Sequence, residues 1–111
     1  MTFHVKALPK AEADVRSIAN YIYERSHQGA EAWLNAYREA RLRLVENASV
    51  YGPAVENKHF DVEVKQLLFK TRLGRVYRLI YTIVGDEVRI LRVRGPGQAA
   101  IKPSEVDSDK I

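Results

Sequence analysis

Cysteine is absent from the sequence, which excludes disulfides, a thiolate nucleophile and any cysteine-based metal site. The three histidines, His4, His27 and His59, lack metal-ligand spacing, so we expect neither a metal nor a cofactor. No phosphate-binding loop, nucleophile elbow or zinc-protease motif occurs. No apolar run approaches the roughly 20 residues of a membrane-spanning helix, and the first residues lack a signal-peptide core. We therefore expect a soluble, cytoplasmic protein without membrane contacts.

Acidic residues are scarce in one part of the chain, the basic window formed by residues 65–94. It holds eight of the eighteen basic residues and two of the fourteen acidic ones, a net charge of +6. The remaining residues, with ten basic and twelve acidic side chains, carry −2. Positive charge gathered in one segment predicts a surface for an anionic partner, either nucleic acid or an acidic protein segment.

The first half of the chain predicts a strand followed by two helices. Apolar and polar residues alternate over residues 3–7, as in a strand with one buried face. Apolar residues then recur at helical spacing from Pro9 and again from Ala30, with a break at residues 26–29. We expect the second helix to end near Asn47 or Ala48 and a polar loop to follow.

The second half predicts three strands and a C-terminal tail. Residues 63–70, 75–83 and 87–94 read as strands joined by short turns. The fold class is therefore α+β in the order β-α-α-β-β-β, with an antiparallel helix hairpin on one face of an antiparallel sheet. We expect one domain over residues 1–97 and a loosely ordered tail over residues 98–111.

Strand alternation predicts which side chains share a face of this sheet. The more apolar face, which should meet the helices, comprises Tyr77, Leu79, Tyr81, Ile83, Leu91 and Val93. The opposite, open face then carries Lys70, Arg78, Arg92 and Arg94, with Arg72 just beyond a strand end.

An exposed face of a two-layer domain is often simply solvated. Like charges on neighbouring strands destabilise a sheet, however, so a set without interspersed acids favours an anion-binding surface. An exposed Arg78 further predicts that Arg78→Ala leaves folding nearly intact.

Four features carry a resemblance to a known family. They are the opening strand, the helix hairpin with Ala32-Trp33 early in its second helix, the strand at residues 76–81 and the closing strand at residues 86–93. In this order and spacing, the chain resembles the RelE/ParE superfamily of bacterial type II toxins over about residues 3–98. The resemblance implies a toxin that is neutralised by a cognate antitoxin, whose flexible segment wraps around it.

The superfamily divides by target. RelE-like members are ribosome-dependent mRNA endoribonucleases, and the resemblance would make Arg78 the phosphate clamp, assisted by Lys70, Arg72 or Arg94. RNA cleavage also needs a proton carrier, and arginine serves poorly because it stays charged. No tyrosine follows Tyr81 and no histidine follows position 59.

The chain therefore looks nearer to ParE-like members, which poison DNA gyrase. Two alternatives stay open. One is the endoribonuclease, which would make the protein an enzyme, and the other is a degenerate member that binds antitoxin without toxicity.

Overall fold

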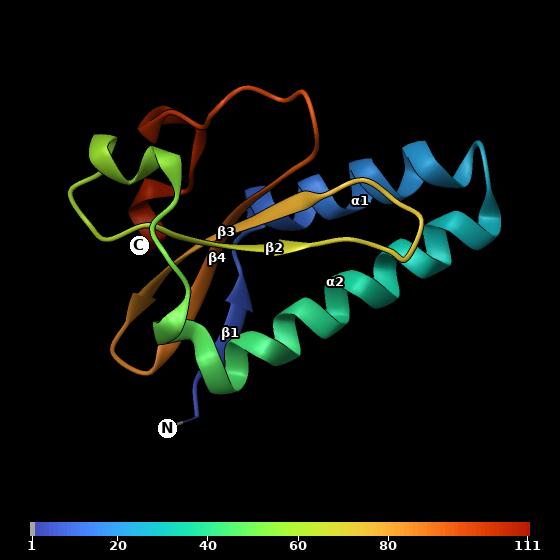
Figure 1. The fold of residues 1–111 in the computed structure, drawn as a ribbon. Coiled ribbons are helices and arrows are strands. Elements are labelled where there is room, and N and C mark those ends of the chain that lie inside the picture. Colours follow the sequence, from blue (N-terminus) through green and yellow to red (C-terminus); the bar gives the residue numbers. More distant parts are fainter. Residues whose placement is uncertain (1) are drawn as a thin grey trace.

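A computed structural model describes residues 2–111 and confirms the predicted α+β order (Figure 1). The helices and strands are β1 (His4–Ala7), α1 (Pro9–Tyr23), α2 (His27–Asn47), β2 (Lys65–Phe69), β3 (Tyr77–Val84) and β4 (Glu87–Arg94). Four short 3₁₀ turns occupy Ala48–Val50, Val55–His59, Pro103–Glu105 and Ser108–Lys110. Within the described residues, neither α1 nor α2 combines the length and apolarity that crossing a bilayer requires.

The four strands form one mixed sheet in the order β1-β4-β3-β2. Strands β2, β3 and β4 are antiparallel to one another, as the sequence predicted. Strand β1 instead runs parallel to β4. Residues 8–86 connect β1 to β4. A connection of this length permits parallel pairing, whereas a tight turn does not.

The two helices begin for identifiable local reasons. Pro9 stands at the first position of α1, where its missing N–H costs nothing. Helix α2 begins at His27 rather than at the predicted Ala30, because the Ser26 hydroxyl accepts a hydrogen bond from the Gly29 N–H at 2.9 Å and caps the helix. Gly29 therefore lies inside the first turn of α2. The end of α2 at Asn47 agrees with the prediction.

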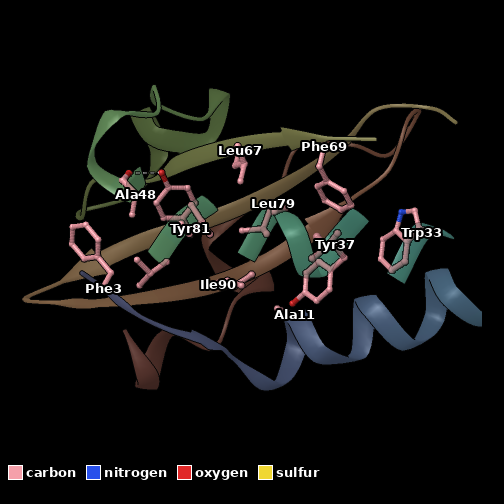
Figure 2. Close-up of a cluster of buried hydrophobic side chains, with 14 residues drawn as sticks. Phe3, Ala11, Trp33, Tyr37, Ala48, Leu67, Phe69, Leu79, Tyr81 and Ile90 are labelled. Atoms are coloured by element: carbon pink, nitrogen blue, oxygen red, sulfur yellow. Dashed lines mark hydrogen bonds between the residues drawn. The ribbon is translucent and has the colours of Figure 1, made fainter. Parts of the chain in front are cut away.

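The main core lies between the helices and the sheet (Figure 2). Trp33 and Tyr37 of α2 pack near Phe69, with ring centroids 5.8 and 6.1 Å away. The Tyr81 hydroxyl donates to the carbonyl of Ala48 at 2.6 Å, and burial raises its pKa. Leu79 and Tyr81 are buried in this core and Tyr77 and Ile83 pack against it, which confirms the predicted helix-facing side of β3.

A β-bulge in β4 changes part of the predicted face assignment. Ile80 pairs with Arg92 and the next residue of β3, Tyr81, pairs with Ile90, so Leu91 is an extra residue on β4. Ile90 thereby belongs to the helix-side core, whereas Leu91 faces the other way. The prediction that Leu91 faces the helices was wrong, because alternation assumes an uninterrupted strand.

The sheet face away from the helices is covered by a second core. Its buried members are Leu8, Ala54, Val64, Ile80, Leu91, Ile101 and Val106. Ile101 and Val106 are only 2% and 4% exposed, so the segment 98–111 packs on the sheet and is not the loosely ordered tail that its polar composition predicted. Ile111 packs against the same core, and hydrogen bonds from Arg92 to the Glu105 carbonyl and from the Lys10 N–H to Asp107 also hold the segment. This segment lies beside residues 52–64 (Figure 1).

Candidate functional site

Arg78 is held by a buried carboxylate. Glu56, on the 3₁₀ turn Val55–His59, is fully buried, and its two oxygens accept hydrogen bonds from both terminal nitrogens of Arg78 at 2.9 and 2.8 Å. Arg78 also donates to the Gln66 side chain at 3.0 Å, and the Ile101 N–H donates to Glu56 at 3.0 Å. A bidentate arginine–carboxylate pair of this kind is strong and fixes the orientation of both side chains.

The protonation state of Glu56 follows from these contacts. Burial by itself raises the pKa of the carboxyl, but the hydrogen bonds from Arg78 and from the Ile101 N–H lower it, and the net pKa lies below the ordinary 4.5. Glu56 is therefore ionised at neutral pH and is a weak base. Glu56 therefore neutralises the charge of Arg78 but is a poor proton acceptor.

Arg92 and Arg94 are also paired with carboxylates of the same chain. Arg92 donates to both oxygens of Asp14 at 2.7 and 2.8 Å, and hydrogen bonding to Asp14 raises its pKa. It also donates to the Glu105 carbonyl at 2.7 Å. Arg94 pairs with the Glu105 carboxylate at 3.0 Å.

The structure thus corrects the predicted open basic face. Arg78, Arg92 and Arg94 do share one side of the sheet, but they are half-buried and paired rather than exposed. Strand alternation could not reveal this, because their partners lie 11 to 78 residues away, in α1, in the 52–64 loop and in the segment 98–111. Binding of a target by these three arginines stays a prediction, and it would require them to leave these pairs.

The other two predicted residues, Lys70 and Arg72, lie in the β2–β3 connection, residues 70–76, which we call the hairpin tip. Both are exposed, as is Arg75, which belongs to the basic window but not to the predicted set of site residues. Within residues 2–111, none of the three takes part in an ion pair or a side-chain hydrogen bond, unlike the arginines on the sheet. The residues predicted to form one site therefore fall into two groups. The sheet arginines are paired with carboxylates, whereas the cations of the hairpin tip have no carboxylate partner within residues 2–111.

A hollow of about 440 Å³, the tip groove, adjoins the hairpin tip. The lining residues include Ile18 and Tyr21 of α1, Arg75 of the hairpin tip and Tyr77 at the start of β3. The remaining lining residues are Ser17, Gly95, Pro96 and Gln98.

A second hollow, the helix groove, follows the outer surface of the helix pair. Its volume is about 550 Å³, and it is lined by Val15, Leu34, Tyr37, Arg38, Arg41 and Leu42. Leu42 is 68% exposed, unusually high for leucine on a helix that otherwise packs into a core. The groove is therefore largely apolar with two arginines among its lining residues, and one of them, Arg41, donates to the Val5 carbonyl of β1 at 3.1 Å.

Comparison with known proteins agrees with the geometry. Residues 5–99 match the family model described as the ParE toxin of a type II toxin–antitoxin system, parDE. A solved structure described as a chromosomal ParDE toxin–antitoxin system from P. aeruginosa has a similar fold, with a TM-score of 0.67 and 20% identity. The similarity covers 85% of this chain and 96% of that one. No curated protein matches the sequence.

Proposed function

The chain belongs to the ParE family of type II toxin–antitoxin toxins, and from that premise we propose that it arrests growth by binding and inhibiting DNA gyrase. In the same proposal, a cognate antitoxin holds it inactive. The toxin would act by binding a macromolecular target and not by cutting a substrate.

One observation carries the choice of binding over cleavage, namely the pairing of Arg78 with buried Glu56. A ribonuclease needs a cation at the scissile phosphate and a group of suitable pKa to move protons. Both terminal nitrogens of Arg78 already bind a carboxylate, and Glu56 is a weak base. The Tyr81 hydroxyl is buried and donates to Ala48. These contacts support a binding function.

The helix groove supports the antitoxin half of the proposal. An amphipathic helix places apolar side chains in a hydrophobic groove, and acidic residues on such a helix would meet Arg38 and Arg41, which line this one. Leu42→Asn should therefore weaken antitoxin binding about tenfold or more, as expected for loss of a central apolar contact. Isothermal titration with the purified cognate antitoxin would measure this.

The target is tested with purified DNA gyrase and with a translation extract in parallel. We expect the chain to inhibit supercoiling and to leave messenger RNA intact on translating ribosomes. Ribosome-dependent transcript cleavage with normal supercoiling would instead establish the RelE-like endoribonuclease. Antitoxin binding with normal growth after induction would identify a degenerate, non-toxic member.

A further inference from the structure

We propose that the hairpin tip and the tip groove together form the docking surface for an acidic, apolar-containing segment of the protein that this toxin inhibits. The inference deepens the proposed function and rests on it for the identity of that partner. It moves the target-binding surface from the sheet arginines to the β2–β3 connection.

Charge is the first argument. Lys70, Arg72 and Arg75 place three cations within seven residues that contain no acid, and all three are exposed. The sheet arginines, by contrast, each have a carboxylate partner. Unpaired charges in water attract an oppositely charged partner at long range and raise the association rate.

Exposed apolar side chains are the second argument, and they favour a protein over a nucleic acid. Leu73, at the end of the tip, is 95% exposed, and Val76 of the same connection and Leu68 at the end of β2 are about half exposed. Apolar side chains left in water on one hairpin favour a protein-binding surface. Binding to nucleic acid is dominated by phosphate contacts, to which aliphatic side chains contribute little.

The tip groove supplies the third argument, a place for a partner side chain. Tyr21, Tyr77 and Arg75 line it, and tyrosine and arginine are enriched among the residues that dominate protein interfaces. Tyr21 is 60% exposed, and the Arg25 guanidinium lies over its ring at 3.7 Å, which holds the ring in place. A large apolar side chain of the partner would fit between these rings, with acidic neighbours on the tip.

Gly95 at the base of the groove is part of its shape. A Cβ atom at this position would lie 2.9 Å from the Tyr77 ring, too close for ordinary contact. The absent side chain therefore allows the Tyr77 ring to lie close to the backbone at Gly95, and both residues line the groove. Apart from Arg75 of the hairpin tip, the groove is formed by α1, β3 and the residues after β4, so most of it requires little ordering upon binding.

Two tip variants with matched controls test the proposal. Leu73→Asn removes the apolar contact without changing charge, and Arg72→Glu reverses one charge. Val50→Asn and Lys58→Glu make similar changes at exposed positions outside both grooves. Each variant is compared with the wild type for growth inhibition after induction, for inhibition of purified DNA gyrase and for melting temperature.

We expect both tip variants to lose growth inhibition and to weaken gyrase inhibition about tenfold or more, as at an interface centre. Both controls should stay near wild type, and all four melting temperatures should be unchanged.

The possible results distinguish a wrong docking surface from a wrong target. Tip variants that arrest growth as well as the wild type would overturn the docking surface, whatever happens to gyrase. Tip variants that lose growth inhibition, beside a wild type that leaves gyrase active, would keep the surface and remove gyrase as the target. A wild type without effect on growth would overturn both.

A nucleic-acid partner has its own signature. In that case Arg72→Glu would abolish growth inhibition and binding to a single-stranded oligonucleotide probe, while Leu73→Asn would change neither. That pattern would overturn the proposal of a protein partner.

Discussion

Glu56 connects three parts of the chain through one carboxylate. It lies on the turn Val55–His59, accepts two hydrogen bonds from Arg78 on β3 and accepts a third from the Ile101 backbone. The sequence could predict neither its burial nor its partners, because a glutamate in a polar loop is ordinarily exposed. Only the packing of the second core brings these groups together.

Removing Glu56 should therefore destabilise the protein. Glu56→Gln leaves a half-buried guanidinium without its counter-charge, and we expect a loss of about 3 kcal/mol in the free energy of unfolding. Arg78→Ala should have a similar effect, which reverses the sequence-based expectation that this variant folds normally. Urea unfolding measures both, with Lys58→Ala on the same turn as a control expected to change stability by less than about 0.5 kcal/mol. A neutral Arg78→Ala would show that the buried pair contributes little.

Acid should weaken the same pair. The pKa of Glu56 in the folded protein lies below its ordinary 4.5, so the unfolded chain takes up a proton first as pH falls. The stabilisation is fully present above pH 4.5 and is lost as pH falls through the lower, folded-state pKa. Urea unfolding measured from neutral to acidic pH should show this loss, and Glu56→Gln should show a shallower dependence. Identical pH profiles would contradict the assignment.

At the scale of elements, the helices and strands were largely predictable and the contacts between distant elements were not. Helical and strand periodicity are local properties, and they located α1 and β4 correctly. The bulge at Leu91 has no such local signal, so the face of that residue was missed. In the candidate site, the exposure of Lys70 and Arg72 was predictable because a turn projects into solvent, but the pairing of the strand arginines depended on residues far along the chain.

The segment 98–111 should contribute measurably to stability. Ile101→Ala removes a buried side chain from the second core and should cost about 2–5 kcal/mol, since a cavity would remain over the sheet. The neighbouring Lys102 is exposed, so Lys102→Ala should be nearly neutral. Thermal or urea unfolding distinguishes the two variants. Equal stability of both would return the segment to the loosely ordered state predicted from its composition.

At the scale of the whole molecule, the charges fall into two classes with different sensitivity to salt. The Arg78 and Arg92 pairs are partly withdrawn from water and are screened little, whereas the cations of the hairpin tip are fully exposed to screening. Raising ionic strength should therefore slow association with the target while changing folding stability only slightly. Stopped-flow or surface-based kinetics at increasing salt would measure the rate, and Arg72→Glu should flatten its dependence. A rate independent of salt would mean that the tip charges do not guide binding.

The second core also has a consequence for biosynthesis. A ribosome makes the chain from its N-terminus, so Ile80 and Leu91 are synthesised before Ile101 and Val106, which pack with them. Until the segment 98–111 docks, the sheet presents an apolar face that the finished protein covers. Chaperones or a second nascent copy would therefore encounter apolar surface that the folded protein does not expose.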